Sequence, residues 1–503
     1  MDLSSKILAL IEPTIEPHVI QADSRGEEEG EVDKLTKTTG IDSPVIFMND
    51  YIFEKNDVIS FTLSNVGKIP TATATIIDSK NAFAIDAFPR DGDYFTVFIN
   101  SKNESTFKAI HLDFELTSID TSIGKAGDSK KVSISGRVKV HKMFSENCQS
   151  LSNNNSLEHL TQVAQELGLG LASNIDVTSD EQTRIQPFIN YYDFIRQIVD
   201  SSYISDDSFQ DYFIDPYYYL NYVDVNKIIN SPNPPLSEFE DSFNSANVSI
   251  TEESYADDGL DSTLTKLLLT NNIQFKSQNQ YINKYEIVNS SKTVTDRHGH
   301  FRDIQIYDDN SDSKLDEFRL EALSTDPANL KDIEEPLKGS RENEEYLDLV
   351  KHKYVGRQDV GEGELGNVHP NYSYAHLNNI RNQEELNKLK IVVTLESFNP
   401  SLYRFQKVPV LMYHTDKKSI NTALSVDEVK KEAGFTDAAI AVDNNTEEPV
   451  ENPDQVLDQF LSGYYLVESI EVIYKQKVGA FYQKVTLLRR DWPARIAAIN
   501  SNT

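Results

Sequence analysis

Cysteine is nearly absent from this chain of 503 residues, which contains a single one, Cys148. A lone cysteine excludes a disulfide within the chain and is typical of assembly in a reducing cytoplasm. Its surroundings offer no base of the kind that activates a catalytic thiol. We therefore expect Cys148 to be a buried or half-exposed residue at the end of the first group of strands, without a chemical role.

Long apolar runs are missing as well. No stretch approaches the ~20 residues of a membrane-spanning helix. The opening MDLSSKILALIEPTIEP has neither a basic segment nor a cleavage site, so it does not fit a signal peptide. Its apolar residues have helical spacing and predict a short helix that packs on a neighbour or docks on a partner: Leu3, Ile7, Leu10 and Ile11.

Positive charge is scarce, with 48 basic against 80 acidic residues and a net charge of -32. Binding to phosphate backbones needs clustered lysine and arginine, so we do not expect tight or sequence-specific nucleic-acid binding. An acidic surface repels DNA, and it would therefore suit a channel wall that DNA passes without sticking. The alternative is that the charge only keeps the protein in solution.

Signatures of catalysis and of cofactor binding are absent from the sequence. It contains no G-x-S-x-G nucleophile elbow and no glycine-rich phosphate loop. With 80 acidic residues, carboxylate pairs are too common for any one pair to indicate a glycosidase site. We therefore predict no catalytic residue, no cofactor-binding residue, no cofactor and no enzymatic activity.

One acidic segment resembles part of a calcium loop. Asp308, Asn310 and Asp312 match the first ligands, but Ser313 stands where the turn needs glycine and Arg319 where a bidentate glutamate is required. The motif is therefore incomplete.

A second pattern, His298 and His300, would place two imidazoles on one face of a strand. No third ligand stands near them, and a polar turn that holds two histidines is the alternative. We predict no metal site, and the sequence leaves open whether this pair binds a metal.

Strand-like segments dominate what the sequence does contain. Tyr 24 and Phe 24 against Trp 1 favour sheets and assembly surfaces, because a tyrosine ring packs while its hydroxyl stays in water. Between residues 44 and 141, six or so β-branched and aromatic runs are separated by turn residues such as Asp91-Gly92-Asp93. The run KVSISGRVKV alternates and predicts one buried face that contains Val132, Ile134, Gly136, Val138 and Val140. This spacing predicts an antiparallel barrel or sandwich.

The next segment, 156–226, predicts a compact α/β unit. SLEHLTQVAQELGLGL has helical periodicity, with Ser156 as the expected N-cap and Gly168 as the expected end. FINYYDFIRQIVDSSY predicts a second helix, and DYFIDPYYYLNYVDV predicts a pair of aromatic strands. Later strands are expected at 263–289, 301–307, 389–397 and 407–413, with a closing hairpin that turns at Lys477-Val478-Gly479 and a helix near 377–388.

The predicted fold is mainly β with an α+β insert. It has two antiparallel β-barrel-like tube domains, the second discontinuous, and a small helix–helix–strand domain. The expected segments are an N-terminal helix and acidic segment (1–43), the first barrel (44–150), the α/β insert (151–230), an acidic linker (231–262), the second barrel (263–310 and 389–495) and irregular inserts (311–388 and 414–456).

The order of these features resembles the late-control or tail-hub family, which comprises the baseplate hub proteins of contractile-tailed phages and their type VI secretion relatives. The resemblance rests on the turn at Asp91-Gly92-Asp93, on the closing hairpin of 463–493 and on two helices. The helix residues concerned are Leu160, Val163, Ala164, Leu167 and Gly168, followed by Tyr192, Phe194, Ile195 and Ile198. It covers 44–226 and 389–493.

The resemblance implies a homotrimer whose two barrels per chain match a hexameric tail tube to a threefold spike, with DNA passing through without specific binding. It further implies tail tube-initiator proteins, a separate central spike protein and other baseplate proteins as partners. The implied location is the virion tail baseplate, assembled in the cytoplasm of the bacterial host. A tail-associated peptidoglycan hydrolase and a receptor-binding tail protein are the alternatives.

Overall fold

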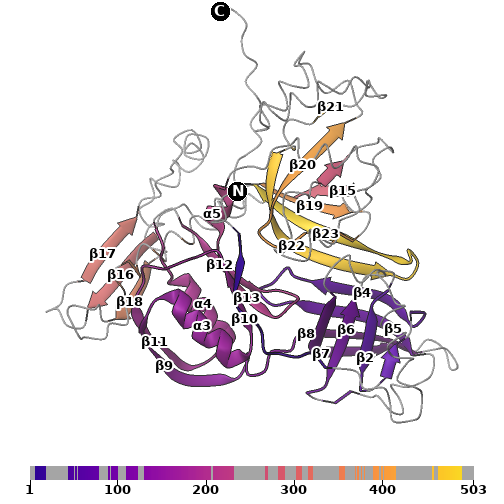
Figure 1. Ribbon diagram of the computed structural model, residues 1–503, viewed down its shortest axis with the longest axis horizontal. Helices are drawn as coiled ribbons and strands as arrows, with labels where there is room; N and C mark the ends of the chain where they lie inside the picture. The colour runs from indigo at the N-terminus through magenta and orange to yellow at the C-terminus, as the bar shows by residue number, and fades with distance from the viewer. Residues whose placement is uncertain are drawn as a thin grey trace, which may run out of the picture.

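The computed structural model describes about half of the chain, in discrete stretches. These are residues 6–18, 43–49, 51–53, 55–78, 89–90, 92–99, 109–122, 130–205, 208–231, 267–269, 281–288, 302–308, 315–320, 351–356, 369, 371–372, 375, 379, 389–395, 398–399, 402–414, 456–457, 461 and 463–489. The strands greatly outnumber the helices (Figure 1), so the predicted mainly β class is confirmed.

The N-terminal group of strands is an antiparallel sheet in the order β4-β5-β8-β7-β6-β2-β3. Its strands are β2 (Val45–Met48), β3 (Tyr51–Phe53), β4 (Val58–Ser64), β5 (Thr71–Asp78), β6 (Tyr94–Ile99), β7 (Ile110–Ser122) and β8 (Lys130–Val138). Strand β8 follows the predicted alternation, with Val132, Ile134 and Val138 buried in the core. At Gly136 the backbone of β7 and the ring of Phe95 come too close for any side chain.

The C-terminal group of strands continues the same sheet in the order β15-β19-β23-β22. Its strands are β14 (Leu267–Leu269), β15 (Ile282–Ile287), β19 (Leu389–Leu395), β20 (Lys407–His414), β21 (Val456–Leu457), β22 (Gly463–Lys475) and β23 (Ala480–Arg489). The turn between β22 and β23 is where the sequence predicts it, with Gly479 at φ 73°. Strand β22 pairs with β4 over five residue pairs, so both predicted groups of barrel strands belong to one 14-stranded sheet.

The α/β unit consists of a four-stranded sheet and two helices. The sheet order is β1-β10-β13-β12, with β1 (Leu8–Ile11), β10 (Gly170–Ser173), β12 (Gln210–Ile214) and β13 (Tyr219–Asp224). Helices α3 (Ser156–Leu167) and α4 (Tyr191–Asp200) confirm the two predicted helices, and α5 (Val225–Ile229) follows β13. Gly168 ends α3 with φ 75°, as expected, whereas the N-cap is Asn155 and not Ser156.

A two-stranded ribbon covers the outer side of the helices (Figure 1). It is formed by β9 (Glu146–Asn154) and β11 (Gln182–Asn190), which the sequence did not predict. The segment of β9, ENCQSLSNN, has few β-formers, and its strand conformation comes from pairing with β11. Cys148 lies on β9 and is exposed. The expectation that it is buried or half-exposed at the end of a barrel is therefore wrong.

The predicted N-terminal helix is also wrong, because Leu8–Ile11 form strand β1 along the edge of β10. The apolar run is only five residues long before Glu12 and Pro13, too short for an isolated helix, and β10 offers backbone partners that local spacing does not reveal. A further three-stranded sheet contains β16 (Arg302–Asp308), β17 (Leu315–Leu320) and β18 (Lys351–Gly356).

Most of the helix predicted near 377–388 lies outside the described residues. No helix in the part of the chain that the structure describes is both long and apolar enough to cross a membrane.

Candidate functional site

A buried cluster in the α/β unit brings together serine, histidine and aspartate, the residue types of a hydrolase triad. Ser156 begins α3 and donates its hydroxyl to Asp180 Oδ2, while Asp180 Oδ1 accepts the backbone N–H of Ser156 at 3.0 Å. Arg184, on β11, donates to Ser156 Oγ at 2.7 Å and contacts His159 Nδ1 at 2.7 Å. Ser156, His159 and Asp180 are almost completely buried, so no substrate reaches them.

The tautomer of His159 also prevents triad chemistry. The guanidinium of Arg184 can only donate, so Nδ1 of His159 accepts and its proton lies on Nε2, which donates to Ser152 O at 2.7 Å. Burial, aided by the charge of Arg184, lowers the pKa of His159 to about 4. The imidazole is therefore neutral, with both nitrogens engaged, and neither can take a proton from Ser156. The cluster ties α3 to β11.

A cavity of about 630 Å³ lies between the α/β unit and the large sheet. One wall is a row of cross-strand partners on the four-stranded sheet: Ala9, Ala172, Asn221 and Phe213. The facing wall is a row of partners on the large sheet: Leu63, Val472 and Gln483. Apolar side chains predominate, as in ligand and peptide sites.

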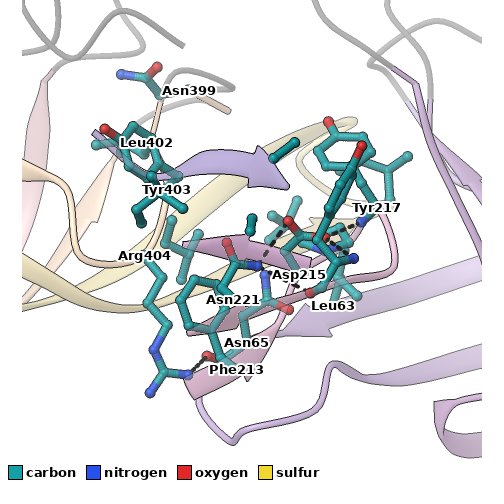
Figure 2. A pocket seen from close by; sticks show the side chains of 18 of the residues that line it. Leu63, Asn65, Phe213, Asp215, Tyr217, Asn221, Asn399, Leu402, Tyr403 and Arg404 are labelled. Carbon is teal, nitrogen blue, oxygen red and sulfur yellow. Dashed lines mark hydrogen bonds between the residues drawn. The ribbon is translucent and has the colours of Figure 1, made fainter. Parts of the chain in front are cut away.

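The loop that follows β19 closes one side of the cavity (Figure 2). Figure 2 shows Asn399, Leu402, Tyr403 and Arg404 on that side, and Tyr217 with Asp215 on the other. Gln483 holds the loop, because its Oε1 accepts from Asn399 N at 2.8 Å and its Nε2 donates to Asn399 O at 3.1 Å. The loop is therefore fixed to β23 by two hydrogen bonds.

Arg404 joins the α/β unit to the large sheet. Its Nη1 donates to Gly67 O at 2.6 Å, and its guanidinium lies 5.1 Å from the Phe213 ring and 5.2 Å from the Phe405 ring. Burial lowers the pKa of Arg404, although a guanidinium so placed stays charged because its usual value is far above neutral. Its position within cation–π distance of two rings limits the freedom of the Arg404 side chain.

Two lysines strengthen this junction. Lys68, which follows β4, forms an ion pair with Asp211 on β12. Lys407 donates to Ile229 O and Ser231 O, both at 2.9 Å, where α5 ends. Burial lowers the pKa of Lys407 to about 8. The carbonyls at a helix end favour a cation, so this lysine binds the end of α5 to β20.

The carboxylates beside the cavity are engaged in local structure. Asp215 Oδ1 accepts the backbone N–H groups of Tyr217 at 2.8 Å and Tyr219 at 3.0 Å, and its Oδ2 accepts from Asn221 Nδ2 at 3.1 Å. Glu12 accepts from the hydroxyl of Tyr219. Neither carboxylate is poised as an acid or base, so the cavity has the character of a binding site.

The incomplete metal patterns are not assembled into a site by the described residues. Asp308 ends β16 and Arg319 lies on β17, while Asn310, Asp312 and Ser313 lie outside the described residues, as do His298 and His300. Within the described part of the chain, no three His, Cys, Asp or Glu side chains could share a metal ion. No local pattern signals the cavity, because its walls come from segments more than 400 residues apart.

Comparisons with known proteins find no matching family model and no matching curated protein. Among solved structures, the chain is similar to the 43 kDa tail protein of prophage MuSo2 from Shewanella oneidensis, with 11% identity, a TM-score of 0.44, and coverage of 89% of this chain and 97% of that one. A tail protein from Neisseria meningitidis MC58 shows 8% identity, a TM-score of 0.44, and coverage of 89% and 96%.

A component of the type VI secretion system of E. coli shows 7% identity, a TM-score of 0.37, and coverage of 88% and 76%. These structures are of the kind that the sequence resemblance names. With TM-scores below 0.5, however, they are too distant to assign a family to this chain.

Proposed function

We propose that this chain is a structural hub of a contractile-tail baseplate, a homotrimer that joins a hexameric tail tube to a central spike. The proposal begins from the sequence resemblance in the helices of the α/β unit and in the closing hairpin. It gives the chain a mechanical role without an enzymatic activity.

The observation that carries the proposal is the ladder between β4 and β22. Its register runs from Ser64 opposite Glu471 to Ser60 opposite Lys475, and it makes one sheet from strands near both ends of the chain. A continuous hydrogen-bonded sheet transmits load without an internal hinge. It also presents two lobes of strands side by side, so that three copies would present six lobes to a sixfold tube.

The edges of the large sheet support an assembling role. Within the described residues, its strand order ends at β15 on one side and at β3 on the other. Unpaired strand edges favour association with another chain, and formation of a ring would cover them. The α/β unit is anchored to this sheet by Arg404, Lys68 and Lys407, so it would move with the sheet as one body.

The acidic balance supports the proposed DNA channel. With a net charge of -32 the chain repels phosphate backbones, and a wall of this sign would let DNA slide past. We expect the assembled protein to leave the mobility of linear double-stranded DNA unchanged in a gel at low salt, where non-specific binding is strongest.

Native mass measurement of the full-length chain, with and without tail-tube and spike partners, tests the proposal. We expect a species of about 171 kDa, three times the 57.0 kDa chain, that is retained or promoted when the partners are added. A chain that stays monomeric in the presence of both partners would contradict the hub role. Release of soluble fragments from purified peptidoglycan would instead favour the hydrolase alternative.

A further inference from the structure

Strand β1 is an apolar edge strand without the usual protection. Its sequence is Leu8-Ala9-Leu10-Ile11, and Leu8 and Leu10 are each 51% exposed. Natural edge strands normally carry lysine, proline or a covering segment, because half of their backbone N–H and C=O groups point outward unpaired. Within the described residues β1 pairs with β10 alone, and none of them pairs with its outer edge.

The cavity between the two sheets reaches this open edge. It is lined by four consecutive residues, Lys6, Ile7, Leu8 and Ala9. Leu8 and Ala9 belong to β1, whereas Lys6 and Ile7 precede it. Successive side chains of a strand point to opposite faces, so contact with both Leu8 and Ala9 means that the cavity meets the edge of the strand and not one face only. The free backbone groups of β1 and the apolar walls of the cavity therefore belong to one groove.

The shape and charge of the groove indicate which kind of segment can bind in it. An extended segment can pair with β1 while alternate side chains enter the space left by the small residues Ala9 and Ala172. Pro13 limits pairing at the far end, because it has no N–H to donate. Near the start of β1, Lys6 forms no ion pair with any described residue, whereas Glu12 at the other end is bonded to Tyr219. Among the described residues, Lys6 is thus a positive charge that an acidic residue of a bound segment would complement.

We infer that the groove along β1 is a docking site for an extended segment of a partner protein, which adds a fifth strand to the sheet of the α/β unit. The segment has alternating apolar residues and an acidic residue placed opposite Lys6. This inference does not depend on the hub role, since it rests on one edge and one cavity within a single chain.

Selection from a displayed library of random hexapeptides on the immobilised full-length protein tests the inference. We expect enrichment of peptides that alternate apolar residues and carry an acidic residue at one end. Peptides selected on the Lys6→Glu variant should carry a basic residue at that end in place of the acidic one. The Ala9→Trp variant fills the groove at an exposed position, and it should lower enrichment of the wild-type peptides at least tenfold.

Two matched variants serve as controls outside the groove: Lys131→Glu on β8 and Val177→Trp in the loop after β10, where Val177 is 62% exposed. Both variants should enrich the peptides selected on the wild-type protein to the same degree as the wild type does. Equal enrichment on wild type and on Ala9→Trp, or no enrichment above a blank surface, would overturn the inference. It would equally be overturned by self-association of the wild type that Ala9→Trp abolishes, since a second copy would then occupy the edge.

Discussion

Gly136 and Gly67 lie in very different surroundings. A Cβ at Gly136 would lie 2.6 Å from Phe95 Cε1 and 2.7 Å from the carbonyl oxygen of Glu115. The oxygen belongs to the β7–β8 ladder and cannot move without breaking it. A Cβ at Gly67 would meet nothing closer than 3.7 Å.

We expect Gly136→Ala to lower the free energy of unfolding by about 1–3 kcal/mol, the usual cost of overpacking a core. Gly67→Ala should stay within about 0.5 kcal/mol of wild type, as surface substitutions do. Urea unfolding followed by circular dichroism measures both. Equal stability of the two variants would show that β8 can shift away from Phe95.

His159 predicts a pH dependence of stability. Its folded pKa, about 4, is below the unfolded value of 6.5, so the unfolded chain binds the proton more readily. The contribution of neutral His159 to the free energy of unfolding is therefore complete above pH 6.5. It is lost as the pH falls from 6.5 to about 4, with a slope of at most about 1.4 kcal/mol per pH unit.

Comparison of the wild type with His159→Gln between pH 7 and pH 4 isolates this contribution, because other histidines titrate in both proteins. We expect the difference in unfolding free energy between the two proteins to shrink on acidification. A constant difference between wild type and His159→Gln would contradict the buried, neutral imidazole.

At the scale of elements, the attachment of β1 depends on a close approach at Gly170. A Cβ there would lie 2.6 Å from Tyr219 Cδ1 and 2.8 Å from the carbonyl oxygen of Ile11. We expect Gly170→Ala to push β1 away from β10, and amide exchange of residues 8–11 to quicken at least tenfold. The amides of β12 should keep their protection. Unchanged exchange in β1 would show that Tyr219 alone gives way.

Elements with strong local patterns were predictable from sequence. Helix α3 has apolar periodicity and Gly168 at its end, and β8 alternates cleanly, so periodicity and turn residues sufficed. The N-cap prediction was one residue late because Asn155 and Ser156 are both good caps, and only the bond from Glu158 N to Asn155 distinguishes them.

Elements that depend on distant partners were not predictable. Strands β1 and β9 exist because β10 and β11 offer them backbone partners, and no local propensity encodes that. The cavity is a stronger case, since its walls are contributed by β1, β10, β13 and β12 on one side and by β4, β22 and β23 on the other. A site built from segments so far apart in the sequence leaves no local pattern that predicts it.

At the scale of the whole molecule, the β4–β22 ladder joins the two predicted groups of strands. Two groups of strands separated by a long, polar middle segment read as two barrels, because pairing across hundreds of residues leaves no local pattern. The structure joins them edge to edge. The division into the predicted domains remains a prediction, while the mainly β class follows from the strands themselves.

Thr62 lies in the middle of this junction and pairs with Thr73 on one side and with Ile473 on the other. Proline at this position removes a ladder hydrogen bond and is found almost only on edge strands. We expect Thr62→Pro to lower the free energy of unfolding by more than the roughly 0.5–3 kcal/mol typical of single substitutions. It should also abolish the species of about 171 kDa.

Thr62→Val keeps the backbone donor and favours a strand, so it should retain both the melting temperature and the assembly. Thermal unfolding and native mass measurement compare the two variants. A stable, assembling Thr62→Pro protein would show that the ladder does not unite the two groups of strands.

The same ladder has a consequence for synthesis on the ribosome. Ser64 and its contact Glu471 are 407 residues apart, so β4 must wait for its partner until nearly all of the chain has been translated. At roughly 5–20 residues per second, that wait is on the order of 20–80 s. During this time the outer edge of β4 is open, and its alternate residues Ser60, Thr62 and Ser64 keep one face of that edge polar. The nascent sheet therefore carries its own protection against premature pairing until the last hairpin arrives.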